Sequence, residues 1–440
     1  MNFQLLIDKC KQNGINDVEI YSVHTSGESV SLFNLDIDDN TVDDLNCYSI
    51  RAIIDNKNVS TYVENITEDH FDTVVNHLLT QAKYLQNTDS QELYEDKNIV
   101  DIKENLENDF DTYSKDKQIK YLQDLVKKVK DYSNLVTTVQ AELSFKELSK
   151  SLVNTKGLNK NYSKKVGRIV LEVVVKKDND TRSSFAYQSF NNVSEIDINK
   201  LLNDSVVDAI NSLGAKSIKT DSYKVVISNK CMITLLSAYS MHFSASNVIK
   251  KMSNFSDKLN TKVFGENVTI IDDPYKNEFN HQPFDDEGVK TYSKEIVSNG
   301  VLKTFMHNRT TASLLNTTTT GNGFKASMQS GLEVSPCNLY LKEGSKELDE
   351  VFKDMFNGVY ITGFDGAHAG INAVSGNFNL KASGYLVENG KISKPLTLII
   401  LSGNFFDMMN DINEIASDLD FRSNIGSASV YVNKMNISGK

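Results

Sequence analysis

The stretch Val359–Met409 reads VYITGFDGAHAGINAVSGNFNLKASGYLVENGKISKPLTLIILSGNFFDMM and decides how the second half of the chain is interpreted. Glycines recur among short runs of strand-forming residues, and such glycines mark bulges, tight bends or close approach of another backbone. The tetrapeptide Glu388-Asn389-Gly390-Lys391 predicts a β-hairpin. Two interpretations stay open: a curved antiparallel sheet whose glycines only allow closure, and a cleft wall along which an extended ligand lies.

The sequence around this stretch is also rich in strand and turn signals. A domain boundary is expected near Lys216–Tyr223. Beyond it, Asn229 is expected to cap a helix that runs to about Ser246, Asn299-Gly300 predicts another hairpin, and Asp407–Leu419 resembles a late helix. We therefore expect residues 221–440 to form a β-rich C-terminal domain with a curved sheet.

The first half shows the same order of elements twice. The first set is the helix Phe3–Gln12, the strands Val18–Val23, Ser29–Leu35 and Tyr48–Ile54, and a helix capped by Thr67. The second set is the helix Gln118–Tyr132, the strands Val139–Phe145 and Arg168–Val175, and the helix Ile198–Leu213. This order predicts an α+β N-terminal domain (residues 1–220) of two duplicated α-β-β-β-α units, 1–110 and 111–220. The polar segment Asn87–Asp111 is expected to connect them.

Composition narrows the class of protein. The chain has 440 residues, 40% of them hydrophobic, and its 47 basic and 58 acidic residues give a net charge of −11. An acidic balance argues against a nucleic-acid groove. Its cysteines form no CxxC pair, and no apolar run is long enough to span a bilayer. We expect a cytoplasmic protein that binds neither nucleic acid nor membrane.

Few residues suggest catalytic chemistry. There are seven histidines, and neither HExxH nor HExxxH occurs. His242 stands on a helix without any Asp or Glu between Asn229 and Ser256. No GxSxG or Walker A motif is present. We predict no catalytic residue and no metal ligand. The acidic cluster Asp285–Glu287 is expected either to bind a ligand or to form a structural turn, and an unorthodox metal site built by distant histidines stays an alternative.

Several longer motifs resemble a known family. They are PFDDEGV (283–289), GVLK (300–303), TTGNG (319–323), GINAVSGNFNLKASGYLVENGKI (370–392) and LSGNFF (401–406). In this order they closely resemble the TldD/PmbA family. The resemblance implies a duplicated α+β N-terminal domain, a β-rich C-terminal domain, a dimer in the cytosol and a role in the proteolysis of peptides or small proteins. Family members have also been called modulators of DNA gyrase.

The family has two kinds of subunit, and this chain resembles the second. TldD-like subunits carry HExxxH on the first helix of the C-terminal domain, and a Cys in a later glycine-rich motif completes their zinc site. Here the helix Asn229–Ser246 has neither the paired His nor the Glu, and Gly366–Gly370 (GAHAG) has no Cys. Both departures match PmbA, also called TldE, the metal-free partner. The resemblance therefore implies no cofactor in this chain and zinc on a TldD-like partner.

This resemblance leads to a first hypothesis for function. The chain would be the PmbA/TldE-like subunit of a zinc metallopeptidase, in a heterodimer with a TldD-like subunit or in a homodimer, and would help enclose a cleft for peptides and unfolded proteins. Strands near Thr317–Gly323 and Ala373–Ser383 would hold the peptide as edge strands do. The cleft candidates are Thr320, Gly321, Asn322, His307, His368, Asn372, Ser375 and Gly376. The alternative is a non-hydrolytic, peptide-binding homodimer.

Overall fold

The computed structural model describes residues 2–86 and 92–440. Its contacts divide the chain into two compact units. Unit 1 contains Met1–Ile210 together with two short segments of the second half, Asp286–Val289 and Lys325–Leu332. Unit 2 contains Asn211–Asp285, Lys290–Phe324 and Glu333–Lys440. The insertion of the two short segments into unit 1 is not foreseen by the sequence.

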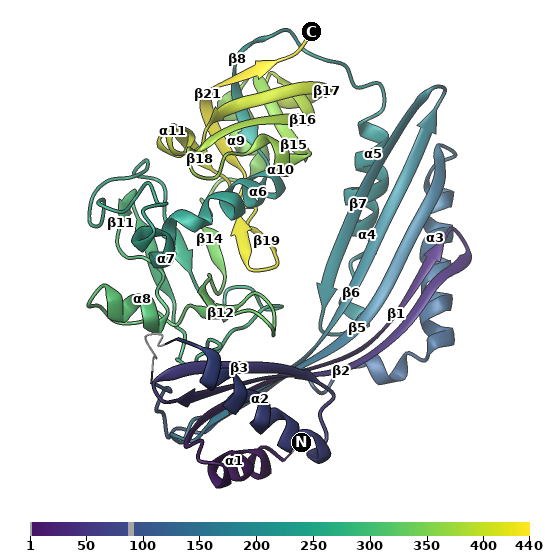
Figure 1. The fold of residues 1–440 in the computed structure, drawn as a ribbon. Coiled ribbons are helices and arrows are strands. Elements are labelled where there is room, and N and C mark those ends of the chain that lie inside the picture. Colours follow the sequence, from purple (N-terminus) through teal and green to yellow (C-terminus); the bar gives the residue numbers. More distant parts are fainter. Residues whose placement is uncertain (1, 87–91) are drawn as a thin grey trace. The chain divides into compact units, whose positions relative to one another are not determined.

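Unit 1 is a long sheet with helices packed on it (Figure 1). The strand order is β3-β2-β1-β5-β6-β4, and β7 also pairs with β6. The elements are α1 (Phe3–Gln12), β1 (Asp17–Phe33), β2 (Asp36–Ile54), β3 (Lys57–Glu64), α2 (Phe71–Tyr84), β4 (Val100–Glu104), α3 (Lys115–Tyr132), β5 (Val136–Asn154), β6 (Asn159–Lys177), β7 (Asp180–Phe190), α4 (Ile198–Leu202) and α5 (Asp208–Asn211). The predicted α-β-β-β-α order is confirmed in both halves.

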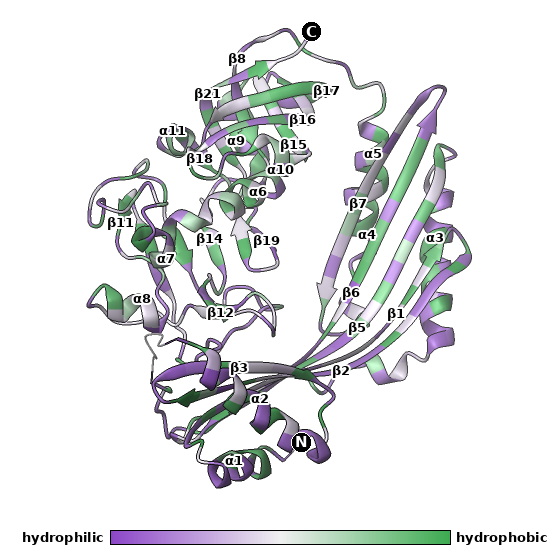
Figure 2. Ribbon diagram, in the orientation of Figure 1, coloured by the Kyte–Doolittle hydropathy of each residue, from purple (hydrophilic) through white to green (hydrophobic). Residues whose placement is uncertain are grey.

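Alternating side chains explain why these strands form. Buried and more exposed residues alternate along β5 and β6, and Figure 2 shows the matching alternation of hydropathy. The amphipathic helices α1 and α2 bury Leu6 and Leu78 against Ile20 and Ile50 of the sheet. The sequence predicts two strands, Val18–Val23 and Ser29–Leu35. In the structure both runs belong to the single strand β1, because β1 continues through the polar residues between them.

The connector Asn87–Asp111 differs in part from its prediction. It contains the strand β4, which pairs in parallel with β6. Residues 87–91 of the connector lie outside the described part of the chain.

Unit 2 contains two six-stranded sheets and a small two-stranded one. One six-stranded sheet has the order β17-β16-β15-β8-β21-β18, and the additional pairing of β17 with β21 curls it into a closed ring of strands. Its strands are β8 (Asp221–Ile227), β15 (Gly358–Asp365), β16 (Asn377–Glu388), β17 (Lys391–Asn404), β18 (Ile412–Ile415) and β21 (Val430–Ser438). The predicted curved sheet is confirmed.

The other six-stranded sheet has the order β11-β10-β9-β14-β20-β19. The remaining strands are β9 (Ile270–Asp272), β10 (Lys294–Ser298), β11 (Val301–Leu302), β12 (Gly323–Lys325), β13 (Leu332–Val334), β14 (Leu339–Leu341), β19 (Asp420–Arg422) and β20 (Ile425–Ser427). The helices are α6 (Asn229–Tyr239), α7 (Ala245–Ile249), α8 (Arg309–Leu314), α9 (Leu348–Met355), α10 (Ala367–Gly370) and α11 (Phe405–Asn410). A single apolar core connects α6 with both sheets.

Both predicted hairpins of unit 2 are present. Asn389 and Gly390 have φ values of 54° and 72° and join β16 to β17. Asn299-Gly300 joins β10 to β11. Gly384 serves close packing within β16, because a Cβ atom there would lie 1.9 Å from the carbonyl oxygen of Tyr360 on β15. At this position the glycine is required by the sheet itself.

Two helix predictions in unit 2 are wrong in detail. The expected helix Asp407–Leu419 ends at Asn410, and Ile412–Ile415 instead forms β18 against β21. The helix that starts at Asn229 is capped by the Ser228 hydroxyl, which accepts a hydrogen bond from Cys231 N, and it ends at Tyr239 instead of near Ser246. A 3-10 turn that contains His242 follows it. None of the helices in the described residues is both long and apolar enough to cross a membrane.

Candidate functional site

Four of the predicted cleft residues meet in one loop structure of unit 2. The backbone N–H of His307 donates to Thr320 Oγ1 at 2.6 Å. The carbonyl oxygen of His307 accepts hydrogen bonds from Thr320 N and Asn322 N, both at 3.2 Å. Gly321 lies between them with φ at 68°, where a Cβ atom would lie 3.0 Å from the Lys290 carbonyl oxygen. The structure therefore brings His307, Thr320, Gly321 and Asn322 together.

Asn322 holds this loop from the inside. Its side chain is fully buried, and Nδ2 donates to Asp272 Oδ2 at 2.8 Å and to the Ser335 carbonyl at 2.9 Å. Its Oδ1 accepts from the Thr320 hydroxyl at 2.7 Å. All polar functions of the amide are thus used within the protein, so Asn322 positions the loop.

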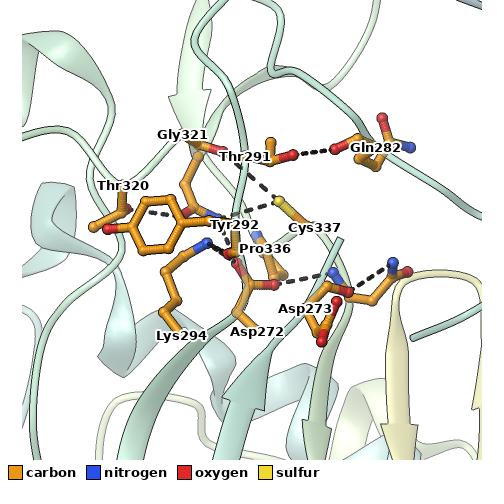
Figure 3. A network of polar contacts seen from close by, with 12 residues as sticks. Asp272, Asp273, Gln282, Thr291, Tyr292, Lys294, Thr320, Gly321, Pro336 and Cys337 are labelled. Atoms are coloured by element: carbon orange, nitrogen blue, oxygen red, sulfur yellow. Dashed lines mark hydrogen bonds and ion pairs between the residues drawn. The ribbon is translucent and has the colours of Figure 1, made fainter. Parts of the chain in front are cut away.

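A buried ion pair supports Asn322 (Figure 3). Lys294 Nζ lies 3.0 Å from Asp272 Oδ2, and the two side chains are 5% and 0% exposed. The other oxygen of Asp272 accepts from Asn338 N at 3.0 Å. Lys294 also donates to the Tyr292 carbonyl at 3.0 Å. A buried carboxylate that keeps an ion pair and several hydrogen bonds is a rigid anchor for the surrounding backbone.

The sequence analysis did not identify Asp272, Lys294 or Asn338. A signal was present, because Asp272 ends the apolar run Ile270-Ile271, where a charged residue needs a buried partner. The position of Asp272 after an apolar run does not indicate which Lys or Arg of the chain forms the ion pair with it.

Cys337 lies beside the same network. Its Sγ is 3.7 Å from the Gly321 carbonyl oxygen and 3.9 Å from Asn322 Nδ2. Burial, with the Asp272 carboxylate as the next cause, raises the pKa of the Cys337 thiol well above its usual value. The thiol is therefore protonated at neutral pH and is not activated as a nucleophile.

The acidic motif 283–289 is built into the backbone. Asp285 Oδ2 accepts a hydrogen bond from Gly323 N at 2.9 Å within unit 2. Asp286 accepts one from Tyr21 at 2.7 Å and one from Lys325 N at 2.9 Å within unit 1. These contacts give both carboxylates a structural role.

The other predicted residues belong to a second group. Asn372, Ser375 and Gly376 form a turn before β16, in which Asn372 Oδ1 accepts from Ser375 N at 3.0 Å and Gly376 N donates to the Asn372 carbonyl at 3.1 Å. His368 lies on α10 and is exposed. Across the described residues, no hydrogen bond joins this turn to the loop of His307, so the predicted set divides in two.

The turn contacts His242, the histidine that follows helix α6. The ring Nε2 lies 2.8 Å from the Ala373 carbonyl oxygen, and Asn254 N lies 3.2 Å from Nδ1. Burial lowers the pKa of His242, so the ring is neutral and donates through Nε2 while Nδ1 accepts. Neither nitrogen is left for a metal ion.

Within the part of the chain that the structure describes, no group of three or more His, Cys, Asp and Glu side chains is arranged to hold a metal ion. His307 is buried, its pKa is lowered by burial, and its Nδ1 has no hydrogen-bond partner. The residues present do not fit a zinc site of the tetrahedral N, O and S type.

The structure offers little free strand edge where binding by edge strands was expected. Residues 317–322 form a loop, and strand β12 begins only at Gly323. Strand β16 is paired on one side with β15 and on the other with β17, so it offers no free edge. A peptide bound at residues 317–322 or at the turn of Asn372 would contact turns and side chains, and the short strand β12, which pairs with β13 on one side, keeps a free edge beside them.

The fold and the site define an α+β protein with a duplicated N-terminal unit and a curved-sheet C-terminal unit that contains a buried polar anchor. Residues 220–439 match the model of the PmbA/TldA metallopeptidase C-terminal domain. The chain therefore belongs to the PmbA/TldD family.

Individual relatives agree with this assignment. A protein of Buchnera aphidicola named metalloprotease PmbA homolog is 29% identical over 269 residues, 61% of this chain and 58% of the relative. A metalloprotease of Archaeoglobus fulgidus is 35% identical over 185 residues, 42% of each chain. The matched part of the chain thus spans about three fifths of the length of the first of these relatives.

Solved structures match over almost the whole chain. A protein of Thermotoga maritima, described as a proposed modulator of a DNA gyrase, is 28% identical with a TM-score of 0.86 and 99% coverage of both chains. TldE from Thermococcus kodakarensis has a TM-score of 0.88 at 18% identity, covering 99% of this chain and 100% of that one. At that identity the second match supports the fold.

Proposed function

We propose that this chain is the PmbA-like (TldE-like) subunit of a TldD/TldE-type zinc metallopeptidase that cleaves peptides and unfolded small proteins. In this proposal the chain has neither zinc nor catalytic residues of its own. A TldD-like partner carries the zinc, and the two chains enclose the substrate cleft. The complex works in the cytoplasm, which fits four buried cysteines that are all free thiols.

One observation carries the proposal. The imidazole of His242 follows the helix on which TldD-like subunits place their paired zinc ligands, and both of its nitrogens are occupied by backbone groups. A ring that is packed against Phe255 and Phe406 and hydrogen-bonded at both nitrogens is a structural residue. This supports a chain in which the histidine next to helix α6 serves packing and does not bind zinc.

The proposed role in the cleft belongs to the loop of His307, Thr320, Gly321 and Asn322. The Asp272–Lys294 pair holds this loop in one conformation through Asn322. A loop that needs no reordering loses little entropy when it binds a peptide. This supports positioning of the substrate as the contribution of the chain.

The test compares the chain, a TldD-like chain from the same organism, and their mixture. We expect no zinc and no casein hydrolysis for this chain, and chelator-sensitive hydrolysis for the mixture. A matched control is the mixture in which the HExxxH glutamate of the partner is changed to Gln. Stoichiometric zinc and chelator-sensitive cleavage by this chain in isolation would refute the proposal, and a mixture that gains no activity would favour the non-hydrolytic homodimer.

A further inference from the structure

The outer part of strand β2 is a free edge of the unit 1 sheet. β2 pairs with β1 from Asp36 to Ile53, with a bulge at Asp38, whereas β3 pairs only with residues 47–54 of β2. Among the residues that the structure describes, no strand pairs with the other side of Asp36–Leu45. We call this segment the outer β2 edge.

The outer β2 edge is long, and its side chains are uncovered. At about 3.3 Å per residue it spans roughly 33 Å. Every residue from Asp36 to Leu45 except Thr41 is exposed. Val42 is 76% exposed and Ile37 is 54% exposed, and Phe33 and Leu35 beside the edge are also exposed. A long extended edge with exposed apolar side chains is a template for another strand.

The same edge is strongly acidic. Five aspartates lie on it, and the chain has no Lys or Arg between Lys11 and Arg51. They are Asp36, Asp38, Asp39, Asp43 and Asp44. Among the described residues, Asp44 is the one of these aspartates for which an ion pair is seen: its Oδ1 lies 2.8 Å from His24 Nε2. The strand thus interleaves negative charge with apolar side chains.

This charge pattern selects the kind of strand that can pair. A second copy bound through its own outer β2 edge would bring aspartates opposite aspartates, and like charges directly opposite each other destabilise a strand pair. A strand with Lys or Arg between apolar residues would bring opposite charges together and cover Ile37, Val42 and Leu45. Charge complementarity therefore disfavours self-pairing at this edge and favours a basic partner.

We propose that the outer β2 edge binds, by strand addition, an extended segment of another polypeptide in which Lys or Arg alternates with apolar residues. The backbone N–H and C=O groups of the edge give affinity, and the aspartates give selectivity. This inference does not depend on the peptidase role, because it concerns unit 1 and uses no residue of the candidate site in unit 2.

The probe is a synthetic peptide of alternating Lys and Val with the length of the outer β2 edge. Its binding to the full chain is followed by fluorescence anisotropy and by hydrogen–deuterium exchange. We expect slower exchange of the amides of residues 36–45. A peptide of the same sequence with N-methylated amides keeps the charge but cannot complete the strand pairing, so we expect it to give no protection.

Matched variants test the role of charge. The triple change Asp36→Asn, Asp38→Asn and Asp43→Asn is expected to weaken peptide binding about tenfold, because each exposed charge pair contributes modestly and three are removed. The double change Asp116→Asn and Asp131→Asn on α3 removes negative charge elsewhere in unit 1 and should leave the affinity unchanged.

Several outcomes would overturn the inference. Equal protection by the N-methylated peptide would show attraction without strand pairing. Amides 36–45 that are already protected in the free monomer would show that the edge is covered within the chain. A dimer that protects them without peptide would identify a second copy as the occupant. A lack of any protection would also refute strand addition, and in each case the zinc and casein results would stand separately.

Discussion

At the scale of single residues, the candidate site depends on one buried ion pair. Asp272 and Lys294 are almost completely removed from water, and each has further hydrogen bonds to backbone groups. Such a pair is costly to desolvate, so removing one partner leaves an uncompensated charge in the interior. The sequence showed Thr320, Gly321, Asn322 and His307 as candidates but not this pair, because two charged residues far apart in sequence give no pairing signal before the fold is known.

The change Lys294→Met tests this anchor. We expect it to destabilise the protein by about 3–5 kcal/mol, because Asp272 is left buried without its counter-charge. Urea denaturation measures the effect. The matched control is Lys262→Met, which removes the exposed pair of Lys262 with Glu266 and should leave the urea midpoint unchanged. Equal midpoints for the two variants would show that Lys294 is not an anchor.

At the scale of elements, the sequence predicted what is local and missed what depends on pairing. The repeated α-β-β-β-α order and the two Asn-Gly hairpins follow from periodicity and turn chemistry, and the structure contains them. The outer part of β2 has no alternating apolar pattern, so it was not predicted as strand. Ile412 and Ile415 are spaced as on a helix face, yet they form β18, because pairing with β21 outweighs local propensity.

The change Gly384→Ala tests whether the glycine-rich sheet needs its glycines for packing. The new methyl group would meet the Tyr360 carbonyl oxygen across the β15–β16 pair, so we expect a loss of about 1–3 kcal/mol in unfolding free energy. Gly331→Ala is the control, because a Cβ atom there has nothing within 4 Å. Thermal unfolding of both variants measures the difference. A Gly384→Ala protein as stable as the control would favour the alternative that this glycine shapes a binding cleft.

At the scale of the whole molecule, the chain passes from one unit to the other several times. It enters unit 1 between Asp285 and Asp286 and again between Phe324 and Lys325. Local sequence patterns contain no information on such crossings, because the short segments bury themselves against strands that lie far away in sequence. Met328 packs beside Leu152 and Leu158 in this way.

The adjacent carboxylates Asp285 and Asp286 allow the two units to be probed separately. Asp286→Asn puts an amide N–H₂ group where a carboxylate oxygen accepts from Tyr21 or Lys325 N, so we expect faster hydrogen exchange in 325–332. Asp285→Asn should instead speed exchange at Gly323 in unit 2. Exchange profiles that change in the same places for both variants would contradict the division into units.

The closed ring of strands in unit 2 has a consequence for synthesis of the protein on the ribosome. Strand β8 (Asp221–Ile227) is made early, and its neighbour β21 begins only at Val430. At about 5–20 residues per second, roughly 10–40 s pass between the two. During that interval at least one edge of β8 has no partner strand, and unpaired strand edges of nascent chains are prone to aggregate.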